Sequence, residues 1–341
     1  MSIKFRNLRN NYLIGIWFSV LFASLQFRVV SFVLNKNLIF NLEAAEGVIN
    51  GTPHWRVYQS RILGPLLFEG FKFFIDDRFF AYSVTLIILL IISSLIVWHI
   101  GIQRGGLNFA FGLLFILHGL FTYSLSYDWL YIWDFISLII FLLFIEGVIS
   151  KKPTWWFMSI WSVGILNHEN AVFICTYLIA DSIIKWIFQP KINDLKKRNL
   201  NYRKLILGFV CALLSVSIVE FLRDKFLIEA IAPKLFGINW LENKWPFQLF
   251  NNLNVLKLSF SSLNNTPHHS IPILAYLLSV VLIAVLIFIK NPNKYGGFSL
   301  NYLFFISCLF IFGILYESRI YINLIPLCIF AAVVFQNKKQ T

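Results

Sequence analysis

Repeated apolar runs, separated by short polar breaks, constrain this chain more than any other feature of its sequence. A helix needs roughly 20 apolar residues to cross a bilayer, whereas the strands of a membrane barrel alternate in polarity over about ten residues. No such alternation is present, so the runs predict membrane-spanning helices. We place eight of these helices at 12–34, 81–102, 107–125, 131–149, 205–222, 271–289, 298–316 and 320–335.

A further apolar stretch, 154–188, is too long for one span and is broken only at 167–170. Dividing it there gives two short spans and a total of about ten. Only 13% of the residues are charged, against about 25% in soluble proteins, which excludes a soluble enzyme. We therefore expect an all-α, polytopic transmembrane helix bundle that forms a single domain over 1–341.

Lys and Arg collect on one side of this predicted bundle, opposed there only by Glu146, Asp181 and Asp194. Short cytoplasmic loops carry such an excess, so we place that side, with both termini, in the cytoplasm. The net charge of +13 is then a topology signal, and no nucleic-acid partner is expected. The basic residues of that side are Lys4, Arg6, Arg9, Arg104, Lys151, Lys152, Lys185, Lys191, Lys196, Lys197, Arg198, Arg203, Lys204, Lys290, Lys294, Lys338 and Lys339.

Almost all chemically informative residues fall on the opposite, non-cytoplasmic side. Two long loops, 35–80 and 223–270, lie there, and we expect short interfacial helices in both. Segment 247–260 has apolar residues at helical spacing opposite an Asn-rich face, which is typical of a helix lying on a membrane surface. Three short turns, 126–130, 167–170 and 317–319, complete this side, so an active site would face outward.

The first loop carries paired acids and well-spaced arginines. Glu43 and Glu46 are three residues apart, so a helix would present both on one face. Arg56 and Arg61 follow, and the planar guanidinium group suits phosphate or carboxylate. A solvated loop with interfacial aromatics is the alternative for any one of these residues. For the loop as a whole we favour function, since loops of this length are uncommon in compact folds.

The short turns add further charged residues. Asp128 can lie in the headgroup layer, whereas Asp134 lies a turn deeper, where a carboxylate is a candidate site residue. The aromatic residues around them are interpreted as an interfacial belt. Next to Glu169, the His168 imidazole is expected to have a pKa raised toward neutrality, and helix capping is the alternative role for this turn. Glu317 and Arg319 form an acid and base pair at the last turn.

No residue spacing predicts a metal or another cofactor. His268 and His269 are adjacent but lack an obvious third ligand. The four cysteines, Cys175, Cys211, Cys308 and Cys328, lie within apolar runs and are read as packing residues.

These features together resemble the GT-C type of membrane glycosyltransferase, in particular a group of bacterial predicted membrane proteins. Tyr58-Gln59-Ser60-Arg61-Ile62-Leu63-Gly64-Pro65 is similar to their Tyr-Arg-x-Leu-x-Pro segment. Leu166-Asn167-His168-Glu169-Asn170-Ala171 is similar to their Asn-Arg-Glu-Thr-Ala turn, with His in place of Arg. Glu317-Ser318-Arg319, followed by Pro326, looks like their last hairpin. Many relatives also have an Asp close behind the first span, where this chain has glutamates further on.

The resemblance implies transfer of a sugar from a polyprenyl-phosphate-linked donor to a glycan, lipid or protein acceptor at the outer face of a bacterial inner membrane. A base would accept the proton of the acceptor hydroxyl, and cations would neutralise the leaving phosphate. Glu43 or Glu46 would be the base. Arg56, Arg61, His168 and Arg319 would hold the phosphate, Asp128, Asp134 and Glu169 would position a sugar, and Tyr58, Gln59, Asn167 and Glu317 would complete the substrate site.

Other functions remain open from the sequence. A polysaccharide polymerase or ligase would use lipid-linked glycans on the same side of the membrane. A transporter or flippase would explain ten spans, but it favours polar groups near the bilayer midplane. The concentration of polar residues at one face favours surface chemistry instead. A membrane subunit without enzymatic activity is the remaining alternative.

Overall fold

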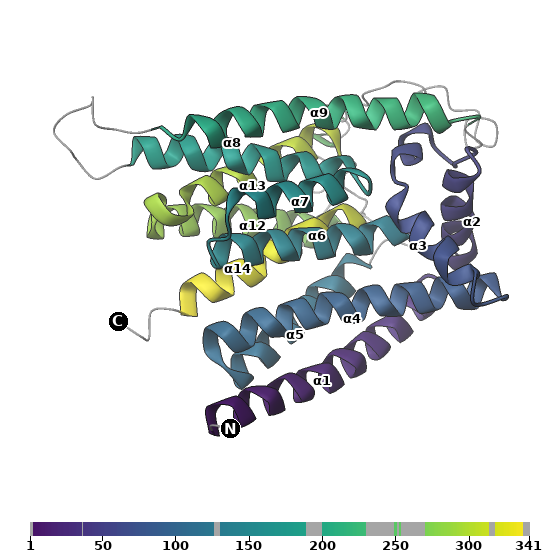
Figure 1. Cartoon of the computed structure of the whole chain (residues 1–341), viewed down its shortest axis with the longest axis horizontal. Coiled ribbons are helices and arrows are strands. Elements are labelled where there is room, and N and C mark those ends of the chain that lie inside the picture. The colour runs from purple at the N-terminus through teal and green to yellow at the C-terminus, as the bar shows by residue number, and fades with distance from the viewer. Residues whose placement is uncertain are drawn as a thin grey trace.

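The helices of this protein lie alongside one another over most of their length (Figure 1). The computed structural model describes residues 3–35, 37–125, 130–188, 200–229, 249–250, 252–253, 270–313 and 318–336. All regular elements in these ranges are helical. The helices that run along the bundle are α1 (Ile3–Val33), α4 (Arg78–Gly105), α5 (Leu107–Ser124), α6 (Ile132–Ile149), α7 (Thr154–Ile165), α8 (Val172–Ile187), α9 (Tyr202–Phe226), α12 (Ser270–Lys290), α13 (Pro292–Phe312) and α14 (Ile325–Gln336).

Seven of the described helices are long and apolar enough to cross a membrane, so this is an integral membrane protein. They comprise α1, α4, α5, α6, α8, α9 and α13. In the described part, α7 has 12 residues, and the apolar parts of α12 and α14 are also short. Each of the ten predicted apolar segments thus contains a helix, while seven meet the requirements for a span.

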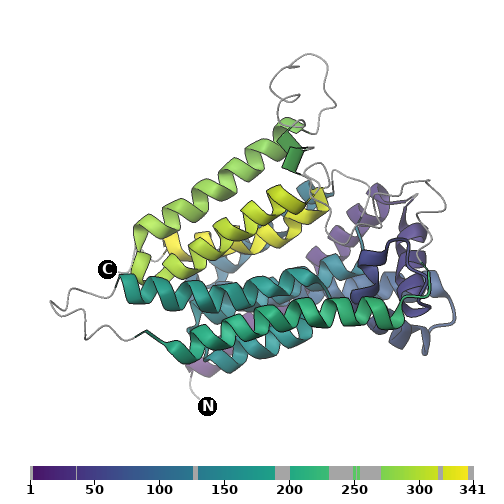
Figure 2. The same cartoon turned by 90° about the horizontal axis from the view of Figure 1, so that it is seen from above.

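The two ends of the bundle differ. The start of α1 and the end of α14 lie at one end, which we call the terminal end (Figures 1 and 2). Across the opposite end, the capped end, lie α2 (Leu38–Ile49), the 3-10 helix η1 (Arg56–Ser60) and α3 (Leu63–Lys72). The predicted first loop, 35–80, thus contains three helices. The Asn41 amide fixes α2 by donating to the Leu130 carbonyl oxygen at 2.8 Å.

Helix α6 lies at the centre of the bundle, where 89% of its span is buried. Its phenylalanines form the core: Phe141 stacks on Phe305 of α13, and Phe144 stacks on Phe298 of the same helix. Only 28% of the spans in α1 and α9 is buried, so these helices lie at the edge. Their apolar outer faces suit contact with lipid rather than water.

Two turns shape the capped end. The α7–α8 break occurs where it was predicted and contains the short 3-10 helix η2 (Glu169–Ala171). The last predicted span, 320–335, begins instead as the 3-10 helix η5 (Ser318–Leu324), and α14 starts only at Ile325. Pro326 stands at the second position of α14, where its missing N–H group is tolerated.

The predicted aromatic belt is wrong for two of its members, since Tyr131 and Trp133 are buried. Their rings pack inside the capped end because α2, η1 and α3 cover it. Most of the predicted surface helix 247–260, together with Asp128 and Glu317, lies outside the described residues.

Candidate functional site

Two arginines and a glutamate from three separate segments meet at the capped end. Arg61 follows η1, Glu169 begins η2, and Arg223 lies in the last turn of α9. Glu169 Oε1 lies 2.8 Å from Arg61 Nη2 and 3.9 Å from Arg223 Nη2. We call these three residues the arginine cluster. Two of them, Arg61 and Glu169, were sequence-predicted site residues.

Backbone contacts explain why these segments meet. The Leu63 N–H donates to the carbonyl oxygen of Leu166 at 3.0 Å, which ties the start of α3 to the α7–α8 turn. In that turn, the Asn167 amide donates to the Trp133 carbonyl oxygen and to Ser137 Oγ. Asn167 is fully buried, so its role is to hold the turn against α6.

A chain of ion pairs extends from the arginine cluster toward the surface. Glu220 accepts from Arg223 Nη1 at 2.8 Å and from Arg56 Nη2 at 3.3 Å. Arg56 also pairs with Asp224, which is two-thirds exposed, at 2.8 Å. Arg56 therefore stands apart from the buried pair of arginines and is neutralised by acids of α9.

Sequence reasoning missed Glu220, Arg223 and Asp224, which fall at the end of the predicted span 205–222. The available signal was the Glu220 to Arg223 spacing of three residues at the boundary of an apolar run. A buried arginine within a spanning helix is a candidate site residue by itself.

Three aromatic rings lie beneath the arginines. Tyr58, Tyr131 and Trp133 have ring centroids 4.6 to 5.1 Å apart, and we call them the aromatic platform. The Arg61 guanidinium lies 5.0 Å from the Tyr58 centroid, and that of Arg319 lies 4.9 Å from the Tyr131 centroid. Desolvated cation–π contacts of this kind are worth about 2 kcal/mol. The platform thus orients two arginines from distant parts of the chain.

Asp134 joins Arg319 to this group. Its Oδ2 atom accepts the Tyr131 N–H at 2.9 Å and lies 3.8 Å from Arg319 Nη1. The predicted intramembrane carboxylate is therefore paired and also caps α6. The neighbouring Gln59 donates to the Val48 carbonyl oxygen and joins η1 to α2.

His168 is neutral, contrary to the sequence-based expectation. Burial and the positive charge of Arg61 lower its pKa to about 3, with further lowering by Arg319 and Arg223, and these effects outweigh the opposing effect of Glu169. Its Nδ1 atom accepts the Asn170 N–H at 3.1 Å and caps η2, so the ring proton lies on Nε2. Any contribution of His168 to anion binding is a hydrogen bond rather than a charge.

Several buried polar atoms of this region have no hydrogen-bond partner among the described residues. They include the Nε atoms of both Arg61 and Arg223 and Oε2 of Glu169. Trp133 Nε1 in the aromatic platform likewise has no hydrogen-bond partner among the described residues. Because buried polar groups are nearly always paired, this group of atoms has hydrogen-bonding capacity that the described residues do not use.

Glu43 and Glu46 lie on α2, as predicted, but neither forms an ion pair with the arginine cluster among the described residues. Glu46 is held between Lys72 at 3.3 Å and Arg78 at 3.2 Å. The pKa of Lys72 is raised, chiefly by its hydrogen bond to Glu69. Glu43 is exposed and has no ion pair among the described residues. Its electrostatic neighbour is His54, whose pKa is lowered by burial despite the opposing charge of Glu43.

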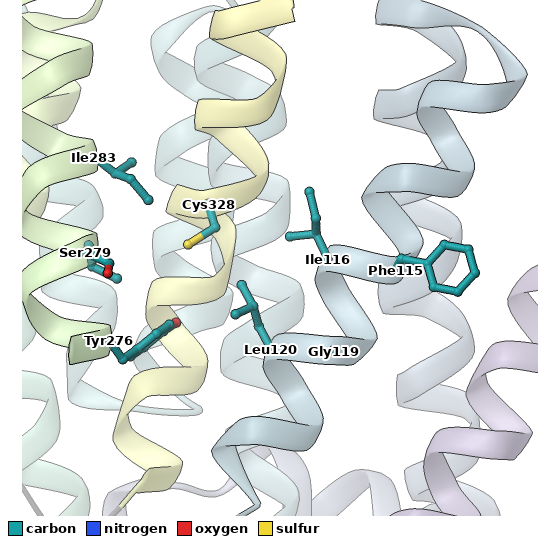
Figure 3. Close-up of a pocket in the computed structure, with 9 residues that line it drawn as sticks. Phe115, Ile116, Gly119, Leu120, Tyr276, Ser279, Ile283 and Cys328 are labelled. Carbon is teal, nitrogen blue, oxygen red and sulfur yellow. The ribbon is translucent and has the colours of Figure 1, made fainter. Parts of the chain in front are cut away.

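An open, shallow apolar pocket of about 520 Å³ lies between α5, α12 and α14, and we call it the lateral groove (Figure 3). Ile116, Gly119 and Leu120 of α5 face α12 across Cys328 of α14. Tyr276 of α12 also lines it, and its hydroxyl donates to the Tyr321 carbonyl oxygen at 3.5 Å. Since Tyr321 belongs to η5, the helix of Arg319, the groove adjoins the segment that carries this arginine.

Comparison with protein-family models, curated proteins and solved structures finds no match to this chain. In the described ranges, no three or more His, Cys, Asp or Glu side chains are grouped as metal ligands. The case for a function thus depends on the site itself.

Proposed function

We propose that this protein is a membrane glycosyltransferase of the GT-C type, which moves a sugar from a polyprenyl-phosphate-linked donor to an acceptor at the non-cytoplasmic face. The observation that carries the proposal is the pair of buried arginines, Arg61 and Arg223, with unpartnered Nε atoms at one end of the bundle. Planar guanidinium groups recognise phosphate through paired hydrogen bonds.

The lateral groove supports a lipid-linked donor in particular. Its apolar lining would accept the isoprenoid tail, while η5 connects it to Arg319 and the aromatic platform. A tail in the groove would lead toward η5, the segment that carries Arg319. This arrangement accounts for one ligand with an apolar part and an anionic part.

In the proposed reaction, the bond between the anomeric carbon and the phosphate oxygen breaks, and the acceptor oxygen bonds to that carbon. The acceptor proton passes to a carboxylate, and the phosphate leaves with the bonding electron pair. Arg61, Arg223 and Arg319 would stabilise the charge that develops on the phosphate. Between the two predicted bases, we favour Glu43, because Glu46 is already paired with Lys72 and Arg78.

The proposal includes a topology. All ten helices would cross the membrane, α2 and α3 would lie at its outer surface, and both termini would be cytoplasmic. The concentration of Lys and Arg in loops of the other side supports this orientation. We place the protein in a bacterial inner membrane on the basis of the resemblance.

The test is turnover of a panel of radiolabelled polyprenyl-phosphate sugars by purified protein in detergent. Wild type should release polyprenyl phosphate, and Arg61→Ala and Arg223→Ala should lose this activity. Arg104→Ala is the matched control, since Arg104 donates to Ile149 and Ser150 at the terminal end. Glu43→Gln should reduce turnover about 100-fold, more than Glu46→Gln.

The same assay separates the other functions. Movement of the lipid-linked sugar between leaflets without release of polyprenyl phosphate would indicate a flippase. Joining of lipid-linked oligosaccharides, with no reaction of single-sugar donors, would indicate a polymerase or ligase. If no donor binds and the arginine variants equal wild type in cells, the proposal is wrong.

A further inference from the structure

The carboxylate of Glu169 occupies the position between the two buried arginines. One of its oxygens, Oε1, lies 2.8 Å from Arg61 Nη2 and 3.9 Å from Arg223 Nη2. An anionic oxygen of a ligand that bridged these two guanidinium groups would lie at the same place. The chain therefore carries an anion of its own where the proposed phosphate would bind.

The second oxygen of this carboxylate is poorly accommodated. Glu169 Oε2 is buried and has no hydrogen-bond partner among the described residues. It lies 3.5 Å from His168 Nδ1, which already accepts the Asn170 N–H. Two acceptors thus face each other, and an unpaired buried acceptor is unfavourable. Glu169 is thus held at this position by the contact of Oε1 with Arg61, while Oε2 adds no hydrogen bond among the described residues.

Glu169 is also the most exposed member of the arginine cluster. Its side chain is 37% exposed, against 7% for Arg61 and 6% for Arg223. Arg61 is fixed over the aromatic platform, and Arg223 is fixed by Glu220 on its other edge. Rotation of the Glu169 side chain toward solvent would open the position between the two Nη2 atoms, of which that of Arg223 also donates to the Val57 carbonyl oxygen at 3.4 Å.

From this geometry we infer that Glu169 is a displaceable internal anion, which competes with the phosphate of the ligand for Arg61 and Arg223. The inference rests on the proposed function, because its ligand is the phosphate of the proposed donor. In the unliganded protein, Glu169 keeps the buried arginines neutralised. On binding, the phosphate takes over the contact with both arginines and the carboxylate turns to solvent. The affinity for phosphate is reduced by the fraction of molecules in which Glu169 blocks the site.

The experiment measures the dissociation constants of a short-chain polyprenyl phosphate and of inorganic phosphate in detergent. Glu169→Gln keeps the shape of the side chain but weakens its hold on arginine, so both ligands should bind about tenfold more tightly. Glu69→Gln is the matched control, since it removes the same charge from a glutamate of similar exposure in α3, whose partner at 2.8 Å is Lys72 and not an arginine of the cluster. It should change either affinity less than threefold.

A second variant protects the test against misfolding. Glu169→Asp keeps the charge but is too short to maintain the contact with Arg61, so it should also bind phosphate more tightly. Thermal unfolding in detergent identifies which variants are folded. The inference is wrong if the folded Glu169 variants bind no more tightly than Glu69→Gln, while wild-type binding is lost in Arg61→Ala. If neither wild type nor any variant binds either ligand, the proposed function fails as well.

Discussion

Two buried charge clusters, one at each end of the bundle, are built in opposite ways. At the terminal end, Asp181 pairs with Lys185 at 2.8 Å and with Lys204 of the neighbouring α9. None of these three residues has a buried polar atom without a partner. At the capped end, two Nε atoms and a carboxylate oxygen of the arginine cluster have no partner within the described part of the chain. The two clusters thus differ in how completely their buried charged groups are paired.

Packing reinforces this contrast. The backbone of Gly297 in α13 lies so close to Asp181 that an added Cβ would be 2.3 Å from its Cα. Three helices thus meet around a filled, paired carboxylate. Around Arg61, aromatic rings fix the guanidinium but do not use its hydrogen-bonding capacity. The terminal-end cluster thus joins three helices, whereas our proposal assigns the arginine cluster to a ligand.

The largest expected effect is on turnover in Arg61→Lys. Lysine keeps the positive charge but lacks the planar pair of donors, so donor turnover should fall about 100- to 1,000-fold. Arg104→Lys, at the terminal end, should remain within twofold of wild type in the same assay. Equal turnover by wild type and Arg61→Lys would show that a positive charge at this position is sufficient for turnover. The paired donors of Arg61 would then not distinguish the capped end from the terminal end.

Asp181→Asn should have the next largest effect, on stability. It leaves Lys204 buried without its carboxylate, and removal of one partner of a buried pair reduces the free energy of unfolding by about 3 kcal/mol. Unfolding in denaturant measures this change. Phosphate affinity of the folded variant should equal that of wild type. A stable Asp181→Asn protein with altered ligand binding would contradict a purely structural role.

The pH dependence of stability sharpens the comparison further. Because the pKa of His168 is lowered to about 3, the folded protein opposes its protonation, whereas the unfolded chain takes up this proton below about 6.5. The contribution of neutral His168 to the free energy of unfolding is complete above pH 6.5 and is lost progressively as the pH falls. Between pH 6.5 and 5, wild type should lose roughly 2 kcal/mol more than His168→Asn, which keeps a capping acceptor. Parallel pH profiles of the two proteins would show that His168 is protonated in the folded state.

A smaller effect is expected from filling the lateral groove. An added Cβ atom meets no atom within 4 Å at Gly119, which lines the groove, or at Gly112, which does not. Gly119→Trp should raise KM about tenfold for long-chain donors and leave short-chain donors unaffected, because only long tails bury apolar surface there. Gly112→Trp, on the same helix, is the control. Similar KM values for both variants would show that the lateral groove does not bind the tail of the donor.

The sequence predicts the helices well and the contacts poorly. Apolar runs locate each long helix because hydrocarbon requires backbone hydrogen bonds to be satisfied within the segment. The meeting of Arg61 with Glu169 also follows in part, since both were placed on one side of the membrane. The pairing of Glu169 with Arg223 depends on how far α9 extends beyond its predicted end, which hydropathy does not define. The low pKa of His168 depends on burial and on arginines that are distant in the sequence but close in the folded protein.

The most direct test of the central claim is an experimental structure of the protein in lipid nanodiscs with a non-hydrolysable polyprenyl-phosphate sugar. We predict that the phosphate lies within hydrogen-bonding distance of Arg61 and Arg223, with Glu169 turned away and the tail in the lateral groove. A ligand bound elsewhere, with Glu169 still in contact with Arg61, would contradict the assignment of the capped end as the phosphate site.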